Sequence, residues 1–196
     1  MRLVDFDTAA RLLNNGEVGV VPTDTLYGIV GRALDPEVVE RIYALRQREL
    51  TKAMIILVAD WDDLKDLHID VASPTRAALE RVWPGPVSAV LPAPDPALEY
   101  LHRGHLSLAV RMPKHEELTK LLKVTGPLVA PSANLAGASP ARSVLEAFSH
   151  FGEAVFYVDG GLKESSASAL VDMQGEQPLV LRAAPGFNVS MLGNNK

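Results

Sequence analysis

Apolar residues recur along the chain at two different spacings. Short apolar runs, such as 17–22 (EVGVVP) and 53–59 (AMIILVA), are typical of buried strands, and the unbroken run at 53–59 favours a central strand. Apolar residues three and four positions apart, as in 35–48 (DPEVVERIYALRQR), predict one face of a helix. Asp35 and Pro36 form a good start signal for that helix. The pattern therefore predicts strands interleaved with helices.

The same two patterns extend over the rest of the chain. Further helices are expected from about Asp7 to Gly16 and over 60–69, 73–83, 114–126 and 141–152. Further strands are expected over 85–93, 106–112, 127–130, 153–161, 166–173 and 178–186. Segments 23–31 and 91–106 are predicted as loops. Several strands follow one another without a helix, which favours an α/β domain with a mixed sheet.

Composition narrows the class of protein. The 196 residues are 47% hydrophobic and 22% charged, enough for one domain with a sizeable core. We place that domain at 1–187, followed by a frayed tail at 188–196. The net charge of −5 disfavours a globally basic nucleic-acid binder. There is no cysteine, and no stretch has the pattern of a signal peptide or a membrane span, so a soluble cytoplasmic protein without membrane partners is expected.

Several familiar site motifs are missing from the sequence. It contains no P-loop pattern, no glycine fingerprint of a Rossmann site and no G-x-S-x-G motif of an α/β-hydrolase. His102 and His105 come nearest to a metal-binding spacing, but surface roles fit them better. No metal site is predicted.

Two polar loops directly follow apolar strands. Thr23, Asp24 and Thr25 leave one strand together, and Ser132 and Asn134 follow another among small residues. Ligands of open α/β sheets bind at the carboxyl ends of strands, where small residues let the backbone approach them. Each loop could also be an ordinary turn.

Five cations stand near the ends of strands or helices. Arg111 and Arg182 each end an apolar run and are expected to be buried, so each needs an anionic partner, either a ligand or an acidic side chain. Arg46, Arg48 and Lys52 lie within one short stretch, where they could cap a helix or bind an anion. Together the five would suit a carboxylate plus a polyphosphate better than one carboxylate.

The sequence contains, in this order, the blocks VPTDTLYGIVG, LRQRELTKAMIILV, WPGPVSAVLPA, LSLAVRMP, APSANLAGASP and SASALVDM with LVLRAAPG. Matching blocks occur in the same order in YrdC/TsaC-type proteins. The sequence resembles that family from about residue 20 to residue 186. The resemblance implies a single domain with a twisted open mixed sheet and helices around a deep, positively lined cavity.

The resemblance also implies an activity. Such proteins are L-threonylcarbamoyladenylate synthases, nucleotidyltransferases that join L-threonine, bicarbonate and ATP and release pyrophosphate. A partner complex then transfers the threonylcarbamoyl group to tRNA. By matched motif, the residues expected around L-threonine are Thr23, Thr25, Lys52, Arg111 and Ser168. Those expected to contact ATP are Arg46, Arg48, Ser107, Ser132, Asn134 and Arg182, with Arg46, Arg48, Ser132 and Asn134 as the catalytic set. Mg²⁺ is expected to be carried by the ATP phosphates, because no carboxylate cluster is evident.

Some positions depart from the family pattern. Arg46 replaces a lysine, Glu49 and Ala53 replace prolines, and Ala169 replaces a threonine. Arginine keeps the charge but not the compact geometry of lysine. These departures, some of them YciO-like, leave two alternatives: a divergent relative that binds RNA or nucleotide without this activity, or an enzyme with another amino acid or acceptor.

Overall fold

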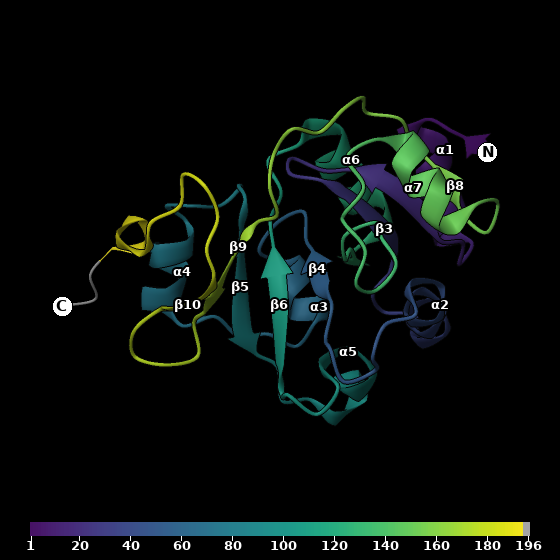
Figure 1. The fold of residues 1–196 in the computed structure, drawn as a ribbon. Coiled ribbons are helices and arrows are strands. Elements are labelled where there is room, and N and C mark those ends of the chain that lie inside the picture. The colour runs from purple at the N-terminus through teal and green to yellow at the C-terminus, as the bar shows by residue number, and fades with distance from the viewer. Residues whose placement is uncertain (194–196) are drawn as a thin grey trace.

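A single mixed sheet forms the frame of the protein. The computed structural model describes residues 1–193, and in this part of the chain the strands form one ten-stranded sheet. Its order is β1-β8-β2-β3-β7-β4-β6-β5-β9-β10. The strands are β1 (Arg2–Leu3), β2 (Gly19–Pro22), β3 (Tyr27–Arg32), β4 (Ile55–Leu57), β5 (Val87–Pro92), β6 (Ser107–Arg111), β7 (Leu128–Val129), β8 (Phe156–Tyr157), β9 (Ala169–Asp172) and β10 (Leu179–Arg182). The first strand, β1, and the last strand, β10, lie at opposite ends of the sheet (Figure 1).

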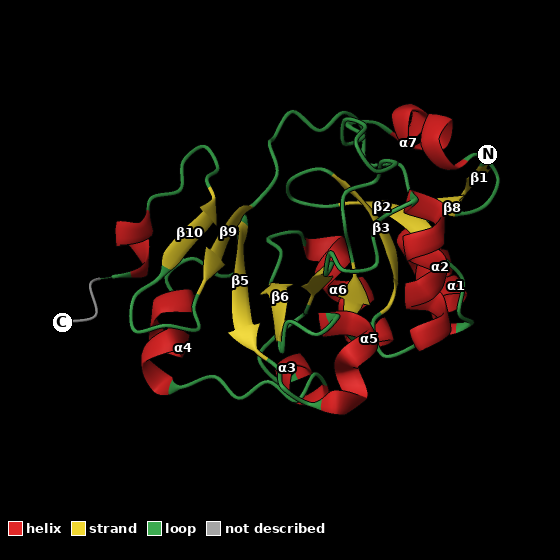
Figure 2. Ribbon diagram, turned by 60° about the horizontal axis from the view of Figure 1, so that its bottom comes forward, coloured by secondary structure: helices red, strands yellow, loops and turns green. Residues whose placement is uncertain are grey.

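The helices lie around this sheet (Figure 2). They are α1 (Phe6–Asn14), α2 (Pro36–Arg46), α3 (Asp63–Asp66), α4 (Ser73–Leu79), η1 (Pro96–Leu98), α5 (Glu99–His102), α6 (Glu116–Thr125), α7 (Val144–Phe151) and η2 (Val189–Leu192). The start signal of α2 acts as predicted, because the Asp35 side chain accepts a hydrogen bond from the Val38 backbone N–H. Gly31 lets α2 pack directly on β3, since a β-carbon there would collide with Val38.

The centre of the sheet is apolar and mixed in direction. β4 lies between β7 and β6, pairing antiparallel with the first and parallel with the second. Ile56 and Leu57 are fully buried, as expected for the central strand predicted from its unbroken apolar run. The mixed α/β sheet is therefore confirmed, and its centre carries the strand ends that form the site.

Three local predictions were wrong. Only the first part of 23–31 is a turn, because Tyr27–Arg32 forms β3 between β2 and β7. Segment 91–106 is more than a loop, since η1 starts with the Asp95 side chain accepting from Ala97 N–H and runs into α5. Helix α1 is capped by Asp5 rather than Asp7.

The C-terminal segment is only partly a tail. Val189–Leu192 forms η2, with Leu192 buried in the core, so the expected fraying does not apply to it. Residues 194–196 of the expected tail lie outside the described residues, and the domain boundary at 187 stays a prediction. Among residues 1–193, none of the helices has the length and apolar character needed to cross a membrane.

Candidate active site

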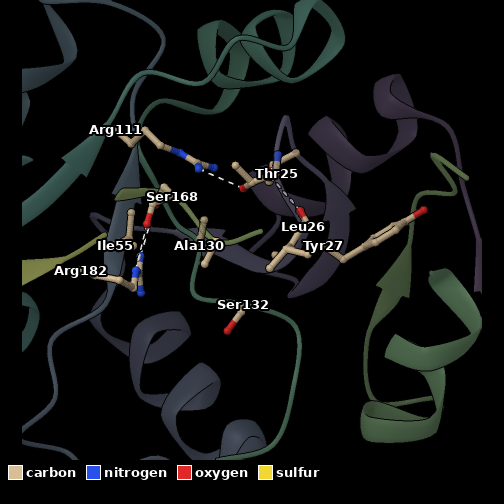
Figure 3. Close-up of a pocket in the computed structure, with 12 residues that line it drawn as sticks. Thr25, Leu26, Tyr27, Ile55, Arg111, Ala130, Ser132, Ser168 and Arg182 are labelled. Carbon is tan, nitrogen blue, oxygen red and sulfur yellow. Dashed lines mark hydrogen bonds between the residues drawn. The ribbon is translucent and has the colours of Figure 1, made fainter. Parts of the chain in front are cut away.

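A pocket opens where the polar loops meet the strand ends (Figure 3). Its volume is about 440 Å³ when the adjoining open solvent is included. It is lined by Thr23, Thr25, Leu26, Tyr27, Gly28, Ile55, Arg111, Ala130, Ser132, Ala167, Ser168 and Arg182. Its charged lining residues are two arginines, Arg111 and Arg182, so a deep cavity lined throughout by positive charge is not confirmed.

The turn between β2 and β3 presents a chain of hydroxyl groups. Thr23 Oγ1 donates to the Leu26 carbonyl oxygen (2.8 Å), so its 3.0 Å bond with Thr25 Oγ1 is donated by Thr25. Thr25 Oγ1 accepts from Arg111 Nη1 at 3.0 Å. Both threonines are buried. The chain of bonds fixes the orientation of two hydroxyl groups in the pocket wall.

Arg111 ends β6 and is buried, as predicted. Its Nη2 lies 3.4 Å from Oδ1 of Asp24, a carboxylate that sits just outside the pocket lining. Burial lowers the pKa of Arg111, while the negative charge of Asp24 raises it. Of the two anionic partners left open from the sequence, the structure shows an acidic side chain, Asp24, and the remaining N–H groups on Nη1 and Nη2 are left for a ligand.

Arg182 reaches the same pocket from β10, but it is exposed rather than buried. The prediction of burial failed because β10 is the last strand of the sheet and all four of its residues are exposed. Arg182 Nε donates to the Ser168 carbonyl oxygen (2.9 Å), and its Nη2 donates to Ser168 Oγ (3.3 Å). Ser168 also shares a 2.9 Å hydrogen bond with Ser88. These bonds hold Ser168 at the edge of the pocket.

Arg46 meets the second polar loop behind the pocket wall. Its Nε donates to the Asn134 carbonyl oxygen (3.1 Å), and its Nη2 to Asn134 Oδ1 (3.3 Å) and Ser132 Oγ (3.4 Å). Its Nη1 is buried and has no partner within residues 1–193. Burial, and then the neighbouring charge of Arg48, lowers the pKa of Arg46 to about 10. This guanidinium therefore retains one unpartnered donor group.

Asn134 is committed to holding this loop. Its side-chain Nδ2 donates to the carbonyl oxygens of Leu135 (2.8 Å) and Ala138 (2.9 Å). Its Oδ1 also accepts from Ser132 Oγ at 2.6 Å. Asn134 thereby uses both donors and both lone pairs of its amide within the protein. It positions Ser132 and Arg46, and Ser132 is the member of the group that lines the pocket.

Arg46 and Arg48 do not point into one cavity. Helix α2 ends at Arg46, and Gln47 takes a left-handed conformation with φ of 51°. Arg48 then turns back, with Nε donating to the Lys52 carbonyl oxygen (3.0 Å) and Nη2 to that of Ala53 (3.1 Å). The Glu49 carboxylate pairs with exposed Lys52 at 3.0 Å. The negative charge that Glu49 adds is therefore matched on the surface.

The predicted residues thus fall into three groups. Thr23, Thr25, Arg111, Ser132, Ser168 and Arg182 line the pocket. Arg46 and Asn134 bond to Ser132 from behind. The third group does not line the pocket and consists of Arg48, Lys52 and Ser107. Lys52 is exposed, and Ser107 lies at the start of β6, at the opposite end of that strand from Arg111.

Two residues in the same motif were given no role from the sequence. Asp24 pairs with Arg111, and the Tyr27 hydroxyl accepts from the Gly160 N–H and donates to the Gly161 carbonyl oxygen, both at 2.8 Å. The Tyr27 bonds fix the start of the long connection from β8 to β9, which carries Ser168 (Figure 1). Both residues lie within two positions of Thr25 in the sequence, but contacts with residues more than 80 positions away cannot be read from local spacing.

Comparison with known proteins identifies the family. Residues 11–184 match the model for the Sua5, YciO and YrdC proteins, described as "Telomere recombination". The chain belongs to this family. This match confirms the resemblance to YrdC/TsaC-type proteins that the sequence motifs indicated.

Individual relatives agree with this assignment. The chain is 34% identical over 173 residues to the threonylcarbamoyl-AMP synthase of Chromohalobacter salexigens, covering 87% of this chain and 94% of that one. It is 32% identical over 177 residues to the threonylcarbamoyl-AMP synthase of Pyrococcus abyssi, covering 89% of this chain and 52% of the relative. The structure of P. abyssi Sua5 complexed with L-threonine superposes with a TM-score of 0.88 at 28% identity, over 94% of this chain and 58% of that one. The chain thus spans about half the length of the P. abyssi relative.

Proposed function

We propose that this chain is an L-threonylcarbamoyladenylate synthase, which forms threonylcarbamoyl-AMP and pyrophosphate from L-threonine, bicarbonate and ATP. Two of its relatives are named threonylcarbamoyl-AMP synthases, and the similar structure of P. abyssi Sua5 is complexed with L-threonine. The proposal carries the activity of these proteins over to the pocket described above.

The observation that carries the proposal is the joint placement of Arg111 and the threonine pair. A buried guanidinium with free N–H groups can bind the carboxylate of an amino acid by charge-assisted hydrogen bonds. The Thr23 hydroxyl is saturated by its bonds to Leu26 and Thr25, and it orients Thr25 Oγ1, which keeps one lone pair beside Arg111 to accept from a substrate hydroxyl. A site that hydrogen-bonds a substrate hydroxyl discriminates strongly against analogues that lack one. This combination favours L-threonine over an apolar amino acid.

The chemistry then needs two bond-forming steps. The threonine amine attacks the carbon of bicarbonate, and loss of water leaves a carbamate. A carbamate oxygen then attacks the α-phosphorus of ATP, the bond from that phosphorus to the bridging oxygen breaks, and pyrophosphate leaves. Positioning and charge neutralisation supply most of the catalysis in such phosphoryl chemistry.

Arg46, which bonds to Ser132, and Arg48, which follows the end of α2, suit the phosphate half of this reaction. Neither Arg46 nor Arg48 forms an ion pair within residues 1–193, and burial lowers the pKa of both. Bound triphosphate would supply the missing negative charge, with Ser132 donating or accepting at the pocket wall. Mg²⁺ would arrive with ATP, since the carboxylate nearest to Arg111, that of Asp24, is already paired. Lys52 and Ser107 keep their predicted roles only if bound substrates extend to them.

The product is a reactive mixed anhydride that needs an acceptor. We assign its use to a tRNA-modifying complex that transfers the threonylcarbamoyl group to adenosine, and we place the reaction in the cytoplasm. Direct RNA binding by this chain is the alternative that the experiment below separates.

The test is pyrophosphate release from the purified chain with ATP, Mg²⁺ and bicarbonate, with and without L-threonine. The proposal predicts release that requires both threonine and bicarbonate, with threonylcarbamoyl-AMP detected by mass spectrometry. L-2-aminobutyrate, which lacks the hydroxyl, is the matched substrate control and should react poorly. If no threonine-dependent release occurs while RNA binds with strong salt dependence, the RNA-binding alternative replaces this proposal.

A further inference from the structure

Asp24 is held from two directions. Its side chain is 10% exposed, and Oδ1 forms an ion pair with Nη2 of Arg111 at 3.4 Å, although Oδ1 has no hydrogen-bond partner within residues 1–193. Oδ2 accepts a hydrogen bond from the backbone N–H of Lys114 at 3.1 Å. Lys114 lies between the end of β6 and the start of α6, so Asp24 ties the β2–β3 turn to the segment that follows Arg111. Its carboxylate cannot swing away without losing the Lys114 bond.

Arg111 depends on this carboxylate. Its side chain is 6% exposed, and Asp24 is the anion with which it pairs in the described residues. Nη1 donates to Thr25, while Nε is buried without a partner within residues 1–193. A buried cation is costly unless it is paired and hydrogen-bonded. Asp24 therefore compensates the charge of Arg111 from the side opposite the pocket, while the bond to Thr25 fixes Nη1.

The charges around the pocket leave room for one anion at this end. Arg111 and Arg182 bring two positive charges, and the charge of Arg182 is close enough to lower the pKa of Arg111. Asp24 brings one negative charge, so one positive charge remains. A single substrate carboxylate would balance it without displacing Asp24, because a guanidinium has five N–H groups to share.

We propose that Asp24 is a positioning residue for the amino-acid substrate, holding the guanidinium of Arg111 from outside the pocket so that its free N–H groups receive the substrate carboxylate. This inference rests on the proposed function and deepens it. Asp24 itself touches no substrate, since it does not line the pocket.

The test compares L-threonine with L-threoninamide, which carries no carboxylate, in the native chain and in Asp24→Asn. Asparagine keeps the shape and can still accept from Lys114, but it removes the charge opposite Arg111. Calorimetric binding should show the preference for L-threonine over L-threoninamide falling roughly tenfold or more, as expected for a weakened charge-assisted contact. The KM for ATP should stay within about threefold of the native value, because Arg46 and Arg48 are untouched.

Two results would overturn the proposal. If Asp24→Asn weakens both ligands equally, Asp24 has only a structural role. If L-threonine binds more tightly to Asp24→Asn, Asp24 competes with the substrate instead of positioning Arg111. Asp35→Asn is the control, because Asp35 also accepts a backbone N–H, from Val38, but follows β3, three strands away from β6 in the sheet, and forms no ion pair in residues 1–193.

Two further measurements keep the test decisive. If Asp24→Asn does not fold, Asp24→Glu retains the charge but moves it by one methylene group. Asp24→Glu should also show a reduced preference for L-threonine over L-threoninamide. A preference equal to that of the native chain would refute the proposal. Arginine Nε–H signals in NMR spectra, assigned with Arg111→Lys, report on Arg111 without any substrate. Asp24→Asn should shift the Arg111 signal, and an unchanged signal refutes the positioning role. If that signal shifts but the native chain releases no pyrophosphate, only the proposed function fails.

Discussion

The two ends of the site balance their charges differently. At the amino-acid end (Thr23, Asp24, Thr25 and Arg111), the buried cation has a buried anion beside it and a hydroxyl chain that fixes its direction. At the phosphate end (Arg46, Arg48, Ser132 and Asn134), two arginines are bonded only to neutral oxygens within residues 1–193. The first end is set for one small anion, whereas the second needs several negative charges from outside.

This difference has an energetic consequence. Removing one partner from a buried ion pair leaves an uncompensated charge and is strongly destabilising, whereas removing a neutral partner costs one desolvated group. Substitutions at the amino-acid end should therefore affect folding and threonine binding together. Substitutions at the phosphate end should affect ATP first.

The largest effect is expected from Arg111→Met. The substitution removes the carboxylate anchor and leaves Asp24 unpaired, so kcat/KM for L-threonine should fall by roughly 10²- to 10³-fold, with lower thermal stability. Steady-state pyrophosphate release and thermal unfolding measure the two effects.

The double variant Arg111→Met/Asp24→Asn should regain stability but not threonine use. Arg103→Met is the matched control, because Arg103 is also nearly buried and paired with an acid, Glu40. An Arg111→Met enzyme with native kcat/KM would contradict the carboxylate anchor.

A smaller effect is expected from Asn134→Ala at the phosphate end. Ser132 and Arg46 lose an acceptor, and two loop carbonyl oxygens lose a donor. We expect a loss of roughly 2–3 kcal/mol in the free energy of unfolding and a KM for ATP raised roughly tenfold. Denaturant unfolding and ATP titration measure these changes.

The control for that variant is Asn14→Ala. The Asn14 amide makes one exposed bond of 3.4 Å, to the Val124 carbonyl oxygen, and no bond to the loop. If Asn134→Ala raises the KM for threonine more than the KM for ATP, the site is not divided into an amino-acid end and a phosphate end.

The contrast also shows what the sequence could predict. Helix α2 and strand β4 followed from a capping pair and an unbroken apolar run, because both signals are local. Strand β3 was missed because its neighbours in sequence are hydroxyl- and glycine-rich, yet its pairing with β2 and β7 decides its conformation. Tertiary pairing overrode local preference there.

Site residues divide in the same way. Motif order brought Thr25 and Arg111 to one pocket, although they are 86 positions apart. Motif order could not predict on which side of the pocket wall each residue lies. Asn134 and Arg46 lie behind that wall, and Lys52 pairs with Glu49 on the surface. Those placements depend on where α2 ends and on a single left-handed residue, Gln47.

A modest effect is expected from Arg46→Lys. Lysine keeps the positive charge but cannot reproduce the fork that bonds Asn134 and Ser132. Pyrophosphate release should stay within about tenfold of the native rate, with a loss of roughly 1–2 kcal/mol in the free energy of unfolding.

Arg46→Met is the comparison, since it also removes the charge and should raise the KM for ATP more than Arg46→Lys does. Equal effects of the two variants on ATP would show that the fork matters and the charge does not. An Arg46→Lys rate well above the native rate would indicate a phosphate site that has drifted from its working geometry.

The smallest effect is expected from His115, whose pKa is influenced by the charge of Asp24 at the amino-acid end. Its Nδ1 accepts from the Leu118 N–H at the start of α6, and burial, followed by the nearby charge of Lys163, lowers its pKa. The unfolded chain therefore binds a proton at a higher pH than the folded chain, so stability falls as the pH drops below about 6.5. His115→Asn can still cap the helix but cannot titrate. Because His115 is partly exposed, the expected effect is small. Between pH 7.5 and pH 5.5, the midpoint of thermal unfolding of His115→Asn should fall by roughly 1–2 °C less than that of the native chain.

The negative charge of Asp24 favours the charged form of His115. Asp24→Asn should therefore make the stability of the chain more dependent on pH. An unchanged pH dependence would show that the charge of Asp24 does not act on His115.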